Sequence, residues 1–160
     1  MTFEEDLTKK PRRLLEKGDA KPSMFINDIS RLFMHRVWQE CEQKGVSRGY
    51  HRLLMELSVN EGATQLQLVK LTHLTAPTVS VALGKMEGEG LVRREADTKD
   101  MRQMKVYLTD KGREKVGLVK ETFRDNDQLL VSGISAEELD AADRVLRKML
   151  VNLLGEEEDK

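Results

Sequence analysis

The residues that could do covalent or metal chemistry are scattered along this chain of 160 residues. Its three histidines (His35, His51 and His73) and its one cysteine, Cys41, do not fall at the spacings that transition-metal sites use. The sequence also contains no glycine-rich phosphate loop, no Ser-His-Asp set and no convincing carboxylate pair. We therefore expect a protein that is not an enzyme and that uses no metal or cofactor.

Polar residues are instead concentrated in a segment that could contact phosphate groups. From Gly62 to Met86 the chain runs for 25 residues without Asp or Glu, although acids make up 28 of the 160 residues. Between Arg93 and Arg113, seven basic residues stand against four acids. An acid-free polar stretch beside a basic segment is what a nucleic-acid-binding surface requires. The alternative is an ordinary solvated surface, and the net charge of −1 excludes only a globally basic binder.

The sequence also indicates a compartment. A single cysteine cannot form an internal disulfide bond, and the N-terminal residues contain no apolar signal segment. No apolar run approaches the roughly 20 residues that a membrane span needs. These observations predict a cytoplasmic protein without a membrane partner.

Helices must position the acid-free segment. Apolar residues at spacings of three and four predict a helix from Ser23 to about Lys44, and Ser47 is expected to cap a second helix. Thr64 begins a capping box that opens a short helix with Leu68 and Leu71 facing inward. A three-residue turn should then lead to a further helix. That helix covers 75–89, with Thr75 as its cap and Pro77 in its first turn. Two strands are expected next, over 91–95 and 104–108. A helix capped by Thr109 should follow from 110 to about 130, and a capping box at Ser135 should open the last helix.

Two short helices joined by a tight turn and followed by a hairpin describe a winged helix-turn-helix. The predicted fold is mainly α with a small β-hairpin wing, and the DNA-binding domain covers 47–109. Residues 1–22 are expected to form a flexible arm. The helices over 23–46 and 110–155 carry apolar stripes that need a partner, and a second copy of the chain is the simplest candidate. These stripes contain Ile26, Ile29 and Phe33 in the first region, and Leu139, Leu146, Leu150 and Leu153 in the second.

Four short motifs resemble the MarR family of bacterial transcriptional regulators. They are Pro77-Thr78-Val79-Ser80, then Gly90-Leu91-Val92 with Arg94, then the wing Asp97-Thr98-Lys99-Asp100-Met101-Arg102, and finally Leu108-Thr109-Asp110-Lys111-Gly112. The resemblance implies a homodimer that binds a pseudo-palindromic operator in double-stranded DNA. It also implies a regulator, usually a repressor, whose DNA affinity changes when a small-molecule effector binds.

The expected DNA contacts come from the helix 75–89, placed in the major groove, and from the wing. Arg102 is long enough to enter a narrow, electronegative minor groove. Asp100, two residues earlier, could hold its guanidinium by a charge-assisted hydrogen bond; the alternative is a solvated ion pair. Glu89 departs from the pattern by bringing an acid close to the DNA side. The candidate DNA-binding residues are Thr75, Pro77, Thr78, Ser80, Val81, Lys85, Arg94, Lys99, Asp100 and Arg102.

An effector pocket is expected between the dimer helices and the DNA-binding module, lined by Met34, Trp38, Tyr50 and His51. Cys41 leaves two interpretations open. Some relatives sense oxidants through a cysteine in their N-terminal region, but Cys41 continues an apolar stripe and buried cysteines are usually inert.

The competing function is a winged-helix module used only for contact with another protein. Such a module would need neither the acid-free stretch nor the Asp100–Arg102 wing.

Overall fold

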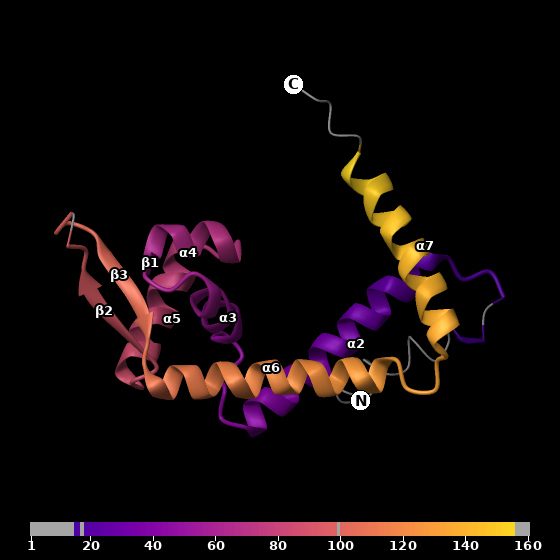
Figure 1. Cartoon of the computed structure of the whole chain (residues 1–160), viewed down its shortest axis with the longest axis horizontal. Helices are drawn as coiled ribbons and strands as arrows, with labels where there is room; N and C mark the ends of the chain where they lie inside the picture. The colour runs from indigo at the N-terminus through magenta and orange to yellow at the C-terminus, as the bar shows by residue number, and fades with distance from the viewer. Residues whose placement is uncertain (1–14, 17, 99, 156–160) are drawn as a thin grey trace. The chain divides into compact units, whose positions relative to one another are not determined.

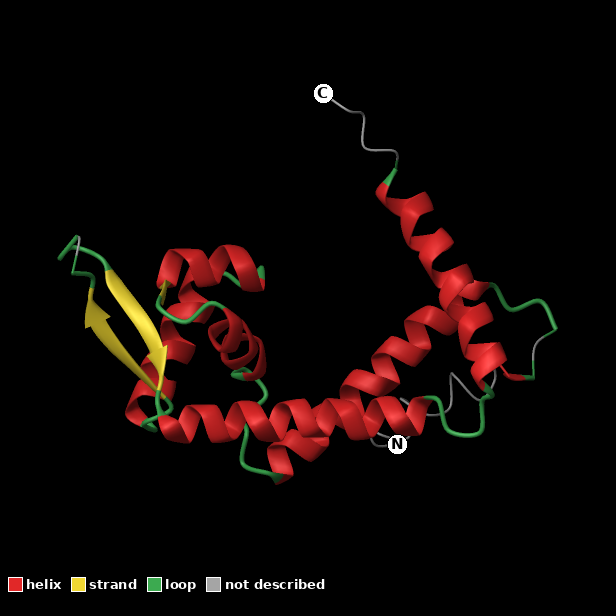
Figure 2. Ribbon diagram, in the orientation of Figure 1, coloured by secondary structure: helices red, strands yellow, loops and turns green. Residues whose placement is uncertain are grey.

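The computed structural model describes residues 15–16, 18–98 and 100–155, and it is mainly helical with one small sheet (Figures 1 and 2). This confirms the predicted fold class. The elements are α2 (Pro22–Gln43), α3 (His51–Val59), β1 (Ala63–Thr64), α4 (Gln65–Thr72), α5 (Ala76–Gly88), β2 (Val92–Ala96), β3 (Met104–Leu108), α6 (Asp110–Leu130) and α7 (Ala136–Leu154). The predicted arm over 1–22 lies mostly outside the described residues, and its last residue, Pro22, is already the first residue of α2.

The sheet is antiparallel with the strand order β1-β3-β2. The wing strands β2 and β3 pair along their whole length, from Val92 opposite Leu108 to Ala96 opposite Met104. The strand β1 was not predicted. It pairs Ala63 with Val106, but two residues are too few to show the alternation that marks a strand in a sequence.

The predicted caps of α4, α5 and α7 are confirmed. Thr64 and Ser135 each form a complete capping box, and the Thr75 hydroxyl accepts a hydrogen bond from the backbone N–H of Thr78. The predicted cap at Ser47 is wrong. Its carbonyl oxygen accepts a 2.9 Å hydrogen bond from the Tyr50 N–H in a turn, and α3 begins only at His51.

A single apolar core joins the helix-turn-helix to the sheet. Leu68 is fully buried as predicted, but Leu71 is 42 % exposed because the inward face of α4 continues through Thr72 instead. The fully buried large side chains are Leu53, Leu54, Leu57, Leu68, Leu83, Met86, Val37, Val46, Val79, Val106, Val119 and Thr122.

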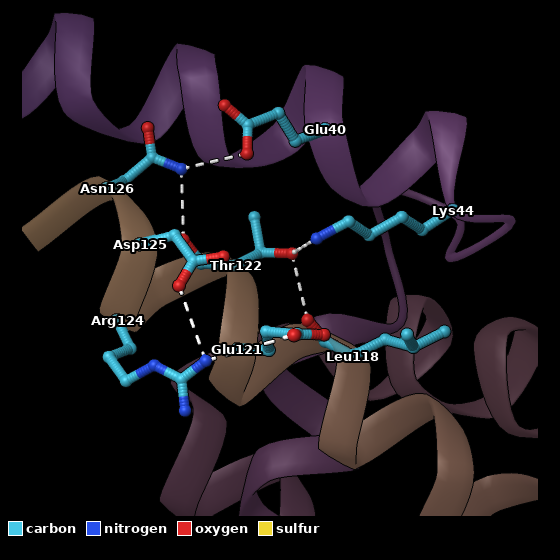
Figure 3. Close-up of polar contacts among 8 residues, drawn as sticks. All are labelled: Glu40, Lys44, Leu118, Glu121, Thr122, Arg124, Asp125 and Asn126. Atoms are coloured by element: carbon cyan, nitrogen blue, oxygen red, sulfur yellow. Dashed lines mark hydrogen bonds and ion pairs between the residues drawn. The ribbon is translucent and has the colours of Figure 1, made fainter. Parts of the chain in front are cut away.

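Polar groups join α2 to α6 (Figure 3). The Lys44 ammonium donates a 2.9 Å hydrogen bond to the Thr122 hydroxyl, which itself donates to the Leu118 carbonyl at 2.8 Å. One turn later the Asn126 amide donates to the Glu40 carboxylate at 3.1 Å. These contacts fix the register of the two helices where buried apolar side chains alone would allow sliding.

The chain divides into two compact units, 1–126 and 127–160. In the second unit α7 has no buried residue, and Leu146, Leu150 and Leu153 are 52 %, 58 % and 86 % exposed. In the first unit Ile26 and Ile29 of α2 are 44 % and 46 % exposed. Of the predicted apolar stripes, Phe33 packs against the core and Leu139 is partly buried, whereas Ile26, Ile29, Leu146, Leu150 and Leu153 stay exposed.

Candidate DNA interface

The turn between α4 and α5 sets the direction of α5. His73 adopts a left-handed conformation with φ 54°, which is uncommon for a residue other than glycine. The buried Thr72 hydroxyl donates a 2.6 Å hydrogen bond to the Leu68 carbonyl and accepts one from the Leu74 N–H at 3.4 Å. The three-residue turn predicted from the sequence is thus held by a polar side chain inside the core.

The helix α5 has one buried face and one exposed face. Val79, Leu83 and Met86 have no exposed surface, as the apolar spacing predicted. The opposite face carries all six candidate DNA-binding residues of this segment, and all are exposed: Thr75, Pro77, Thr78, Ser80, Val81 and Lys85. None of these six residues is acidic. The one acidic side chain of α5, the exposed Glu87, lies in its last turn, so a phosphate backbone could approach the first turns of the helix without repulsion.

The first turn of α5 is pre-formed. The hydroxyls of Thr75 and Thr78 lie 2.8 Å apart and share a hydrogen bond, while Pro77 fills a position where a missing N–H has no cost. The positive end of the helix dipole therefore stands beside two hydroxyls that could both turn toward a phosphate.

The tip of the wing differs from the prediction. The Asp100 carboxylate accepts hydrogen bonds from the backbone N–H of Arg102 at 3.1 Å and from the Gln103 side chain at 3.0 Å. It does not hold the Arg102 guanidinium. An Asp side chain in a turn readily accepts a hydrogen bond from the backbone N–H two residues later, and the Asp100 carboxylate is engaged in that way. The exposed guanidinium of Arg102 is therefore left available, and Lys99 lies outside the described residues.

The other candidate in the hairpin, Arg94, faces the protein. Its Nε lies 3.3 Å from the Glu87 carboxylate, and its side chain is only 28 % exposed. The structure therefore places Arg94 between β2 and Glu87 in the last turn of α5.

The base of the wing is anchored to α6. The Thr109 hydroxyl donates a 2.6 Å hydrogen bond to the Gly90 carbonyl and accepts one from the Gly112 N–H at 3.0 Å. A β-carbon at Gly112 would stand 2.0 Å from the Leu91 carbonyl oxygen, so only glycine fits there. The Leu-Thr-x-x-Gly motif over 108–112 thus joins the start of α6 to the segment between α5 and β2.

A cavity of about 360 Å³ lies next to α5. Three of the four predicted effector-binding residues line it: Met34, Trp38 and His51. Tyr50 does not, because its hydroxyl turns away to donate a 2.7 Å hydrogen bond to the Glu89 carboxylate. The other lining residues were not predicted for this cavity from the sequence: Arg48, Gly49, Arg52, Leu74 and Thr78.

Both cationic groups of this cavity come from arginine. Burial lowers the pKa of His51 to about 4, so its imidazole is neutral at pH 7. The ring lies against Trp38, with centroids 3.6 Å apart. Arg48 and Arg52 stand four residues apart on either side of His51. That spacing could have predicted from the sequence that both arginines line the cavity with His51.

Cys41 is 1 % exposed, and burial raises the pKa of its thiol. Both observations favour the packing interpretation over a reactive thiolate.

Among the described residues, no helix is long and apolar enough to cross a membrane, and no three His, Cys, Asp or Glu side chains gather where a metal ion could bind.

Comparison with known proteins gives one consistent result. The model of the MarR family matches residues 44–103. The transcriptional regulator HosA of Escherichia coli O127:H6 is 30 % identical over 128 residues, which cover 78 % of this chain and 93 % of HosA. The crystal structure of MepR, a transcription regulator of the Staphylococcus aureus multidrug efflux pump MepA, matches with a TM-score of 0.75 at 30 % identity over 83 % of this chain and 98 % of MepR. A MepR–DNA complex matches with a TM-score of 0.66 at 29 % identity over 86 % of this chain and 99 % of that one.

Proposed function

This chain belongs to the MarR family of transcriptional regulators, and from that premise we propose that it is a homodimer that binds a pseudo-palindromic operator in double-stranded DNA. The helix α5 enters the major groove, and the wing formed by β2 and β3 reaches the adjacent minor groove through Arg102. The observation that carries this proposal is the exposed face of α5 opposite three fully buried side chains, which has no acidic residue from Thr75 to Met86. The similar MepR protein has been solved in complex with DNA.

The residues over 47–109 form the DNA-binding part in this proposal, and 23–46 with 110–155 form the dimerisation region. The support comes from the exposed apolar residues of α2 and α7, which a second copy would remove from water. Two-fold symmetry would then place two copies of α5 about 10 base pairs apart on one face of the duplex.

We further propose that the protein responds to a small effector and acts as a repressor. The cavity contacts Trp38 and His51 on one side and Leu74 and Thr78, at the turn and start of α5, on the other. A molecule that fills it would shift the start of α5 and thereby change operator affinity, and DNA would change effector affinity by the same factor. The aromatic rings of Trp38 and His51 beside two arginines suit a small aromatic anion.

Selection of bound sequences from random duplex DNA tests the central proposal. We expect an enriched palindrome and a strong loss of affinity between low and high salt. An absent or salt-insensitive interaction would instead favour a winged-helix module for protein contact. Light scattering at micromolar concentration tests the dimer, and a folded monomer of 18 kDa would rule it out.

The effector is tested separately by thermal shift with a panel of substituted benzoates. We expect binding that is weakened in Arg48→Gln and Arg52→Gln and unchanged in Arg124→Gln, an exposed arginine of α6. A shift that is equal in all four proteins would place the ligand elsewhere.

A further inference from the structure

Two acidic residues stand at the end of α5, immediately after the acid-free stretch. Glu87 lies in the last turn of the helix and Glu89 is its C-cap. Negative charge is unfavourable at the C-terminus of a helix and again unfavourable near DNA phosphates. Partners elsewhere in the protein must therefore compensate both carboxylates, and the structure shows one partner for each.

The partner of Glu87 is Arg94 of the wing strand β2. The Glu87 carboxylate lies 3.3 Å from Nε of Arg94, and that nitrogen is buried with no hydrogen-bond partner of good geometry. The buried Nε is therefore closed to a phosphate outside the protein, and only the rest of the side chain, 28 % exposed overall, could reach one. The neighbouring Arg93 differs: it is 47 % exposed, pairs with Glu95 and lies over the Tyr107 ring at 4.7 Å.

Glu89 is tied to two further elements. Its carboxylate accepts a 2.7 Å hydrogen bond from the Tyr50 hydroxyl, at the start of α3. Its carbonyl oxygen accepts one from the Lys111 ammonium of α6 at 2.8 Å. The end of α5 is thus held from α3, β2 and α6, and the pair of Glu87 with Arg94 is the only one of these three contacts that joins the helix to the wing.

We infer that Glu87 and Arg94 are positioning residues for DNA binding: their ion pair holds the wing at a fixed angle to α5, so that both enter their grooves together. The inference rests on the proposed function, and it assigns Arg94 a role different from direct DNA contact. Two reading elements must be held within a fraction of an ångström of their productive geometry to act as one unit. The Arg94 and Glu87 side chains are 28 % and 44 % exposed, and a pair that is in partial contact with water adds little to folding stability, so variants that lack it should still fold.

The direction in which Glu87→Gln changes DNA affinity shows whether Arg94 positions the wing or contacts a phosphate. If Arg94 contacted a phosphate, Glu87 would compete for its guanidinium, and Glu87→Gln would strengthen binding. If the pair positions the wing, Glu87→Gln must weaken binding even though it removes a negative charge close to DNA. A matched control is Glu95→Gln, which removes the same charge from β2 without touching the pair.

The experiment measures operator affinity of the full-length protein across a salt series, using a duplex selected with the wild type. We expect Glu87→Gln and Arg94→Gln each to weaken binding about tenfold with an unchanged salt slope, while Glu95→Gln binds equally or slightly more tightly. The exchanged pair, Glu87→Arg with Arg94→Glu, should recover most of the loss. Arg94→Lys, which keeps the charge, should recover part of it and serves if the exchanged pair does not fold.

Hydroxyl-radical footprinting supplies a readout that general destabilisation would not produce. In Glu87→Gln the minor-groove protection by the wing should fade while the protection centred on α5 remains. Tighter binding by Glu87→Gln, or a salt slope lower by about one per subunit in Arg94→Gln alone, would overturn the inference in favour of a phosphate contact. Unchanged binding in both variants would also overturn it. A wild-type protein that enriches no duplex would instead refute the proposed function itself.

Discussion

The imidazole of His51 lies against the indole of Trp38, with ring centroids 3.6 Å apart and planes inclined by 45°. The contact joins the start of α3 to the middle of α2 and forms one wall of the cavity beside α5. It also removes much of the imidazole from water, and this burial lowers the pKa of His51 from 6.5 to about 4.

The lowered pKa of His51 predicts a stability that falls with acidity. Between pH 6.5 and 4 the unfolded chain binds a proton that the folded chain does not, so the free energy of unfolding rises with pH in this window. The contribution is complete above pH 6.5 and should be about 1–2 kcal/mol, less than the full shift implies because the ring stays partly solvated. Urea unfolding of wild type and His51→Gln at pH 7 and pH 4.5 measures it.

The matched control for this measurement is His35→Gln, on α2. The carboxylates titrate in the same window in every variant, so the difference between wild type and each variant isolates the histidine. If both variants show the same change between the two pH values, the burial of His51 does not govern its titration.

Gly112 provides a test of the junction between wing and α6. Gly112→Ala places a methyl group 2.0 Å from the Leu91 carbonyl oxygen, and the backbone must move to admit it. We expect a loss of about 2–3 kcal/mol in the free energy of unfolding. Gly117→Ala, on the same helix with open space around its α-carbon, should instead gain about 0.5–1 kcal/mol. Equal melting temperatures for the two variants would contradict this account.

Asn126 tests the polar register between α2 and α6. Its amide accepts a hydrogen bond from Arg36 Nε at 3.2 Å and donates to Glu40 and to the Thr122 carbonyl, while only 4 % of the residue is exposed. Asn126→Ala should therefore cost about 2 kcal/mol, because it removes hydrogen bonds to the buried Thr122 carbonyl and to the partly buried Glu40 and Arg36 side chains. Its neighbour Asp125 is exposed, and Asp125→Ala should change stability by less than about 0.5 kcal/mol in the same unfolding assay.

The sequence was sufficient to predict the helices, three caps and the buried face of α5, because these depend on residues close together in the chain. It could not supply the two-residue strand β1, whose pairing is made with Val106 more than forty positions away. The partners of Arg94 and Tyr50 were missed for the same reason. Glu87 and Glu89 become their neighbours only after the sheet and α3 have packed against the end of α5.

Arg102 tests the wing. Arg102→Ala should weaken operator binding by about 1–3 kcal/mol and lower the salt slope by about one unit per subunit if the guanidinium contacts phosphate. If it instead enters a narrow minor groove, the loss should be larger with A-tract flanks than with G·C flanks.

Asp100→Ala is the companion variant, since Asp100 holds the Arg102 backbone at the tip. Its loss of affinity should be smaller than that of Arg102→Ala and of the same kind. Full affinity in Arg102→Ala on every flank would remove the wing from the mechanism.

The exposed face of α5 predicts the base composition of the operator. It carries no arginine, the residue that most often reads guanine through O6 and N7, and Lys85 is its one cation. Val81 is 60 % exposed there, and it and the Thr78 methyl suit apolar contact with thymine methyl groups. We therefore expect an A·T-rich palindrome with few essential G·C pairs, each wrong pair under Val81 or Thr78 costing about 1 kcal/mol. Replacing thymine by uracil removes only the methyl group, so affinity should fall at the contacted positions and stay constant at the others. An operator that tolerates uracil at every position would show that α5 does not read thymine methyl groups.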